Sequence, residues 1–241
     1  MKLVVFLLVL LLPALLRADD FAKANQAYAA GNYAEARKGY ADVLERGHFA
    51  NAWFNDGNAA YRLNLLGQAA LAYERALLAR PTHPEAAANL KFVRDKSGAR
   101  VTLPPWQEKA WRYVAQPAVT WLLLAEAWLG FALIGAALLR QRRSRGMLAG
   151  GILFVVLGAG GLAALHFTRA ELSGLAVVVA DRADARTEPA DKSSLAEALP
   201  AGSRVQIVSQ QGEWTYCLLP GEGRGWLRSE TVNRILPAAP L

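Results

Sequence analysis

Two long runs without basic residues, separated by a short arginine-rich loop, constrain this chain more than any other feature. Glu126 is the only charged residue in the run 117–139, and the run 147–167 has none. At 1.5 Å per helical residue the first run reaches about 34 Å, more than a bilayer core of ~30 Å. The loop 140–146 carries four arginines, which favours a cytoplasmic loop between two transmembrane helices. The alternative is a buried helix pair in a soluble protein.

The N-terminal residues 1–18 predict a secretory signal peptide. Lys2 precedes an apolar run over 3–16, which would span only about 21 Å as a helix and is too short to cross a bilayer. Cleavage is expected after Ala18, and an uncleaved N-terminal anchor is the alternative. With either a signal peptide or an anchor, the segment after residue 18 would be exported. This agrees with a transmembrane hairpin whose two ends lie outside the cytoplasm.

The charge is distributed in a way that argues against nucleic-acid binding. The chain is 54% hydrophobic and has a formal net charge of +7, a combination that fits a basic nucleic-acid binder or a membrane protein. Outside the expected membrane segments the charges nearly balance, with +3 over residues 19–116 and −1 over 169–241. A nucleic-acid footprint would concentrate bases on one soluble element, so nucleic acid is set aside as a partner.

Residues 19–98 contain an internal repeat with a shift of 33. The shift superimposes Phe21 on Phe54, Asn25 on Asn58, Tyr28 on Tyr61, Ala36 on Ala69 and Tyr40 on Tyr73. The second copy, with Trp53, Gly57, Ala69, Tyr73 and Pro81 at its key positions, resembles a tetratricopeptide (TPR) repeat. Small residues at Gly57 and Ala69 would let two helices approach closely, and a helix starting at Pro84 would cap the stack.

The TPR resemblance implies a peptide-binding groove. By that resemblance Asn25 and Asn58 occupy the groove position that often hydrogen-bonds a peptide backbone or terminal carboxylate, and Tyr28, Tyr61 and Arg62 line the same face. An arginine there would supply charge for a carboxylate. The alternative is that all five are ordinary solvated helix residues.

Residues 99–116 are expected to form a linker and a short interfacial helix. Pro104 and Pro105 stop any helix, and Trp106, Trp111 and Tyr113 then alternate with polar residues, a pattern typical of the headgroup layer. A surface helix packed on the repeats is the alternative.

Residues 177–237 have the pattern of an all-β domain. Short β-rich runs alternate with turns rich in Gly and Pro. The segment resembles a bacterial SH3 domain, and the residues that carry the resemblance are Ala185-Arg186-Thr187, Pro189, Leu199, Gly202, Val205, Ile207, Gly212, Trp214 and Gly225-Trp226. Glu188 stands where that family often has glycine. Trp214, Tyr216 and Trp226 are candidates for a ligand-binding surface. The alternative is that they are structural residues in the core and rim of the barrel.

The sequence holds no set of residues that predicts catalysis. It has no nucleophile elbow, phosphate loop or metal-ligand spacing, so we expect no enzyme, no cofactor and no metal. Glu126 is expected to contact a polar or basic group in a partner's membrane helix, or alternatively the chain's own second helix. Cys217 is interpreted as a core thiol and His166 as an interfacial residue. The glycines at 150–151, 158 and 160–161 are expected to let the membrane helices pack closely, as in Gly146-xxx-Gly150 and Gly160-xxx-Ala164.

The order of these parts predicts a multidomain protein: helical TPR repeats, two transmembrane helices and an SH3-like barrel. This order resembles the BatE family of bacterial aerotolerance proteins, with similar segments at 58–63, 73–77 and 89–94. The resemblance implies an inner-membrane scaffold linked to oxidative stress, with periplasmic TPR and SH3 modules. Its expected partners are Bat-type membrane proteins with von Willebrand factor A domains. Peptidoglycan binding through the SH3 domain is the alternative function.

Overall fold

The structure is a computed structural model that describes residues 20–47, 49–101, 110, 112–114, 116–139, 144–221 and 223–236. The expected signal peptide and most of the expected interfacial segment lie outside these residues, as do residues 140–143 of the loop. The chain divides into two compact units, Met1–Pro104 with Gly174–Leu241 and Pro105–Ser173.

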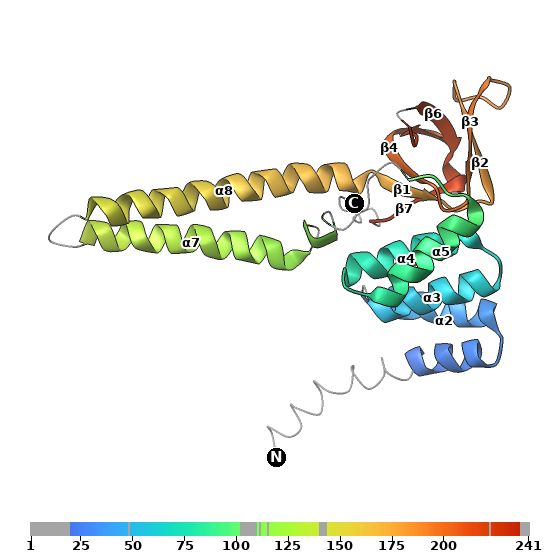
Figure 1. Ribbon diagram of the computed structural model, residues 1–241, viewed down its shortest axis with the longest axis horizontal. Coiled ribbons are helices and arrows are strands. Elements are labelled where there is room, and N and C mark those ends of the chain that lie inside the picture. Colours follow the sequence, from blue (N-terminus) through green and yellow to red (C-terminus); the bar gives the residue numbers. More distant parts are fainter. Residues whose placement is uncertain are drawn as a thin grey trace, which may run out of the picture. The chain divides into compact units, whose positions relative to one another are not determined.

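The first unit begins with a stack of antiparallel helices, here called the repeat domain (residues 20–99; Figure 1). Residues 20–29 form its first described helix. The others are α2 (Tyr33–Leu44), α3 (Ala50–Arg62), α4 (Leu66–Ala79) and α5 (Pro84–Ser97). Local signals set the limits of α5: Pro84 occupies its first turn, His83 caps it by accepting the Ala86 N–H, and Gly98 ends it with φ 71°.

The predicted close approach of two helices at Gly57 is confirmed. A Cβ atom added at Gly57 would lie 2.6 Å from Cε1 of Tyr73, so only glycine lets α3 lie this close to α4. Ala69 and Tyr73 are almost completely buried in the same contact. In the first copy the glycine lies on the second helix instead: an added Cβ at Gly39 would lie 2.9 Å from the Cβ of Ala24, the residue equivalent to Gly57.

The first unit ends with a seven-stranded antiparallel sheet, here called the sheet domain (residues 175–236). Its strands are β1 (Leu175–Val178), β2 (Arg182–Arg186), β3 (Leu195–Pro200), β4 (Arg204–Gln211), β5 (Trp214–Leu218), β6 (Arg224–Arg228) and β7 (Val232–Arg234), with a short 3-10 helix, Ser229–Thr231, before β7. The strand order is β3-β2-β6-β5-β4-β1-β7. Alternating residues such as Val178, Val205, Cys217 and Leu227 point into one core.

The repeat domain and the sheet domain are packed against each other within this unit. A Cβ atom added at Gly67, in the first turn of α4, would lie 2.5 Å from the carbonyl oxygen of Val178 at the end of β1. Glu74 of α4 is 0% exposed and forms ion pairs with Arg94 of α5 and Arg204 of β4. The sheet domain therefore covers the outer face of α4, which a short helical stack would otherwise expose to water.

The chain between the two domains reinforces this contact. The Arg204 N–H donates to the Arg100 carbonyl at 2.9 Å, and the Arg100 N–H donates to Ser203 Oγ at 3.1 Å. Arg75 of α4 donates to the carbonyls of Arg234 and Ile235 at 2.9 and 3.2 Å. Residues 99–100, expected to begin a linker, are thus attached to the start of β4.

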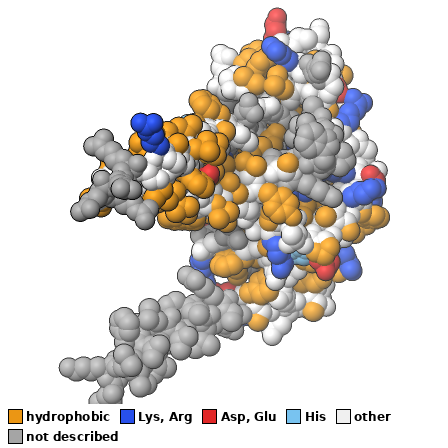
Figure 2. Space-filling view, turned by 60° about the vertical axis from the view of Figure 1, so that its left-hand side comes forward, with side chains coloured by type: hydrophobic (Ala, Val, Ile, Leu, Met, Phe, Trp, Pro, Cys, Tyr) orange, Lys and Arg blue, Asp and Glu red, His pale blue; other side chains and the backbone are white. Residues whose placement is uncertain are grey.

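The second unit is an antiparallel pair of apolar helices, here called the apolar hairpin: α7 (Pro117–Leu139) and α8 (Arg145–Ser173) (Figure 1). Both are long and apolar enough to cross a membrane. Helix α7 has the expected bounds, whereas α8 extends past the expected end at residue 167. Hydrophobic side chains cover most of the hairpin surface that Figure 2 shows.

Three of the glycines expected to pack the hairpin helices do so, and three do not. Added Cβ atoms at Gly151, Gly158 and Gly161 would lie 2.6–3.0 Å from atoms of α7, which confirms the prediction there. Added Cβ atoms at Gly146, Gly150 and Gly160 would meet nothing within 4 Å, so the prediction is wrong for these glycines. The added Cβ atoms of Gly151 and of Gly130 in α7 would each lie 2.7–2.8 Å from the other residue's carbonyl oxygen. Glycine spacing alone marks several faces of α8 and does not select the one that packs.

Candidate functional site

The two asparagines expected at the groove form equivalent hydrogen-bonded clusters. Asn25 Oδ1 accepts from the Tyr40 hydroxyl at 2.8 Å and from Asn55 Nδ2 at 2.9 Å. One repeat later, Asn58 Oδ1 accepts from the Tyr73 hydroxyl at 2.8 Å and from Asn89 Nδ2 at 3.0 Å. The internal repeat therefore preserves a polar cluster as well as a packing pattern.

These clusters leave one type of donor available. Burial raises the pKa of Tyr40 to about 12 and also raises that of Tyr73, so both phenols stay protonated and keep donating to the asparagine oxygens. The Nδ2 groups of Asn25 and Asn58 have no hydrogen-bond partner among the described residues. Each half-buried amide can therefore donate to a carbonyl or carboxylate oxygen of a ligand.

A hollow of about 260 Å³ lies beside the second cluster. Its lining includes Tyr28, Asn58, Tyr61, Asn89, Phe92 and Val93. The rings of Tyr61 and Phe92 meet edge to face at 5.7 Å, and Phe92 is 55% exposed. An exposed phenylalanine at the mouth of a hollow gives an apolar ligand side chain a surface to pack on.

Two cations lie at the Tyr61 end of this face. Lys96 Nζ lies 4.8 Å from the centroid of the Tyr61 ring and 3.5 Å from its hydroxyl. The Arg62 guanidinium stacks over Tyr33 at 4.8 Å and is absent from the lining of the hollow. Lys96, which was not singled out in the sequence, also lies outside the lining of the hollow but contacts the Tyr61 ring, which is part of it.

A second hollow, of about 580 Å³, is lined from the same helices. Its walls include Phe21, Asn51, Phe54, Asn55, Arg80 and Glu85. Phe54 packs on the buried ring of His83 at 4.8 Å, and Arg80 hydrogen-bonds Asn51. Asn25 and Asn55 join the first cluster to this hollow. The helix 20–29, α3 and α5 thus share one surface with two hollows and a row of amides, here called the amide face.

Sequence reasoning found part of the amide face. It placed Asn25, Asn58, Tyr28 and Tyr61 there, all from the internal repeat. It missed Asn55 and Asn89. These two residues are 34 positions apart rather than 33, so a one-residue insertion takes them out of the repeat alignment.

Glu126 lies in the middle of α7, half-buried, in the second unit. Among the described residues it has no hydrogen-bond or ion-pair partner, on its own helix or on α8. His166, interpreted as interfacial, is exposed on α8 and touches the ring of Phe167.

The aromatic residues of the sheet domain lie outside its core. Trp214, Tyr216 and Trp226 are half-buried and alternate with the core residues Cys217 and Leu227. Tyr216 and Trp226 pair across β5 and β6 with ring centroids 5.0 Å apart. They form an outward-facing row, here called the aromatic strip, so the core alternative does not apply to them.

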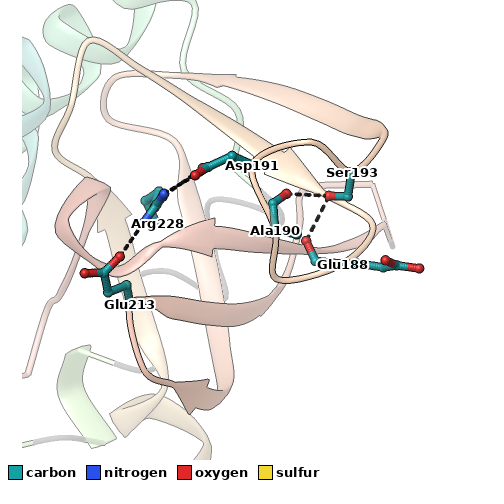
Figure 3. A network of polar contacts seen from close by, with 6 residues as sticks. All are labelled: Glu188, Ala190, Asp191, Ser193, Glu213 and Arg228. Atoms are coloured by element: carbon teal, nitrogen blue, oxygen red, sulfur yellow. Dashed lines mark hydrogen bonds and ion pairs between the residues drawn. The ribbon is translucent and has the colours of Figure 1, made fainter.

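An arginine fixes the loop next to this strip (Figure 3). Arg228 stacks over Trp214 at 4.6 Å and pairs with both Asp191 and Glu213, and the Asp191 contact raises its pKa further. Ser193 Oγ donates to the carbonyls of Glu188 and Ala190 at 2.9 and 2.8 Å. Surface ion pairs and hydrogen bonds thus connect the loop between β2 and β3 to the start of β5 and the end of β6.

Cys217 is a core thiol, as expected. It is 0% exposed, and burial raises its pKa to about 12. A protonated, inaccessible thiol is a poor nucleophile.

The described residues hold no group of three or more His, Cys, Asp or Glu side chains placed to bind a metal ion. Comparison of the chain with protein-family models and with curated proteins gives no match in either case.

Proposed function

We propose that this chain is a membrane-anchored scaffold that binds an extended peptide segment of another protein on its amide face. The observation that carries the proposal is the repeated cluster, in which Asn25 and Asn58 each keep one free amide donor at equivalent positions. Donors repeated along one surface suit a ligand with a repeating acceptor, and the peptide backbone is such a ligand.

The charge and shape of the face favour a peptide that ends there. Lys96 and Arg62 lie at the Tyr61 end, where they complement a terminal carboxylate. The hollow beside Phe92 offers space for an apolar side chain near that terminus. The proposed ligand is therefore the free C-terminal segment of a partner, with an apolar residue close to its carboxylate.

The fold supports a specific identity for each part. The Gly57–Tyr73 contact and the paired helices are consistent with TPR repeats, and the antiparallel sheet with its Gly225-Trp226 strand is consistent with an SH3-like barrel. The apolar hairpin would hold both in the periplasm at a bacterial inner membrane. The order of these parts, which resembles that of the BatE family, supports the proposal that the protein acts in a Bat-type complex linked to oxidative stress, with von Willebrand factor A-domain proteins as partners.

A library of peptides with free C termini tests the peptide proposal on the full chain in detergent. We expect selected peptides to lose at least tenfold in affinity when their C terminus is amidated, which corresponds to about 1.4 kcal/mol. Asn58→Asp removes the free amide donor but keeps the oxygen that Tyr73 and Asn89 need, and it too should weaken binding at least tenfold. Lys96→Met should do the same.

Lys91→Met is the matched control, because Lys91 lies on the same helix but pairs with Asp95. It should leave binding unchanged. Equal affinity for free and amidated peptides, or unchanged binding by the Asn58 variant, would refute a carboxylate-binding amide face.

A second candidate function is binding of peptidoglycan through the aromatic strip. The outward Tyr216–Trp226 pair favours it, since exposed rings give sugars and peptides a stacking surface. Co-sedimentation of the full chain with insoluble peptidoglycan should fall at least tenfold in Trp226→Ala and stay unchanged in Val208→Ala, which alters an exposed residue of β4. Failure of the unaltered chain to sediment would eliminate this function.

A further inference from the structure

Glu126 lies near the middle of an apolar helix. At 1.5 Å per residue it is about 14 Å from the Pro117 end of α7, close to half the ~30 Å thickness of a bilayer core. A carboxyl group at that depth is costly unless protein or water meets it. The groups that surround the Glu126 carboxyl in the hairpin therefore bear on its function.

Glu126 lies at the edge of the face by which α7 packs on α8. An added Cβ at Gly130 would lie 2.7 Å from Val155 Cγ2, and one at Gly158 would lie 3.0 Å from the Ala127 Cβ. An added Cβ at Gly161 would lie 2.6 Å from Leu123 Cδ2. The packing face therefore follows Leu123, Ala127 and Gly130.

Glu126 belongs to the neighbouring stripe of α7. Helical periodicity aligns it with Leu122, four residues earlier, and Leu129, three residues later. These two leucines are 69% and 50% exposed. The stripe Leu122–Glu126–Leu129, here called the Glu126 stripe, is an apolar surface with one carboxyl group at its centre.

The described part of the hairpin offers this carboxyl group no cation. The Gly158 contact places Glu126 level with that part of α8, and Arg169 lies about 16 Å further along the helix at 1.5 Å per residue. Arg145, in the opposite direction, is about 20 Å away. Arg169 itself donates to the Gln116 carbonyl near the end of the hairpin.

We propose that the Glu126 stripe docks a transmembrane helix of another protein that carries a lysine or arginine at mid-span. The inference rests on the proposed membrane insertion of the hairpin. A cation opposite Glu126 compensates its charge, and leucines opposite Leu122 and Leu129 provide packing. A second copy of this chain would present another carboxyl group in place of a cation, so it is the less complementary occupant.

Fluorescence energy transfer in lipid vesicles tests this with the full chain and a synthetic helix as probe. The probe is a Leu/Ala helix of about 23 residues, long enough to span, with one central lysine, and its reference has leucine instead. We expect the lysine helix to bind at least tenfold more tightly than the reference. Glu126→Leu should abolish that difference, and Glu126→Lys should reverse the preference in favour of a helix with a central glutamate.

Trp128→Leu is the matched control, because Trp128 is 72% exposed on the same helix but outside the stripe; it should leave the preference unchanged. Equal binding of the two helices overturns the inference. Self-association that depends on Glu126, without a preference for lysine, identifies a second copy as the occupant and also overturns it. Quenching of Trp121 and Trp128 by brominated lipids measures membrane insertion separately. If the tryptophans are not quenched, both the membrane-anchored scaffold and the helix docking fail. If they are quenched, the binding experiment tests the docking alone.

Discussion

Replacing Glu74 by glutamine is expected to cost about 3–5 kcal/mol of unfolding free energy, the range for breaking a buried ion pair. Glu74 is 0% exposed, and its partner Arg204 is 1% exposed. The variant would leave Arg204 and Arg94 beside a neutral amide in the contact between the repeat and sheet domains. Urea denaturation of the full chain in detergent, followed by tryptophan fluorescence and by circular dichroism, measures the change.

Two further variants show whether burial causes this cost. Glu197→Gln breaks the ion pair with Arg100, a residue whose side chain is 57% exposed, and should cost at most about 1 kcal/mol. Glu74→Leu combined with Arg204→Met and Arg94→Met replaces all three charges by apolar groups and should recover much of the loss. A Glu74→Gln variant as stable as Glu197→Gln would show that the two domains do not bury this pair.

The sequence could predict the helices and their contacts where the signal is local. Residues 117–139 are helical over the expected bounds because an uninterrupted apolar run has few other folds. Gly57 was expected to allow a close helix contact because its distance from Tyr73 follows a repeat pattern. In both cases the interacting groups lie within one helix or one helix pair.

The contact between the two domains could not be predicted in this way. Glu74 and Arg204 are separated by 130 positions, so no local pattern pairs them. Only the folded positions of α4, α5 and β4 show that their charges meet without water. A charged residue in a helix pattern thus gives no sign that it is buried by a distant domain.

The candidate site was predicted in position but only partly in chemistry. The repeat shift located Asn25 and Asn58, yet their oxygens are occupied by Tyr40 and Tyr73, which leaves only the Nδ2 groups for a ligand. Arg62 was expected in the groove, and its guanidinium stacks on Tyr33, whose ring meets that of Tyr28. Side-chain partners decide which atoms of a polar residue remain available, and a spacing pattern does not contain that information.

Gly67→Leu is expected to separate the repeat domain from the sheet domain. An added Cβ would lie 2.5 and 2.6 Å from the carbonyl oxygens of Val178 and Val179. These are backbone atoms, which cannot turn aside as the end of a side chain can. Overpacking of this kind costs about 1–3 kcal/mol, and here the cost falls on the contact between α4 and β1.

Hydrogen exchange at the Arg204 N–H measures that separation, because this group donates to the Arg100 carbonyl at 2.9 Å while the domains are in contact. If exchange follows the open population, 1–3 kcal/mol corresponds to an increase in rate of about 5- to 150-fold. Gly150→Leu makes the same change where nothing lies within 4 Å of the added Cβ, and it should leave the rate unchanged. An unaltered rate in Gly67→Leu would contradict a docked arrangement, since no side chain fits between α4 and β1 while both stay in place.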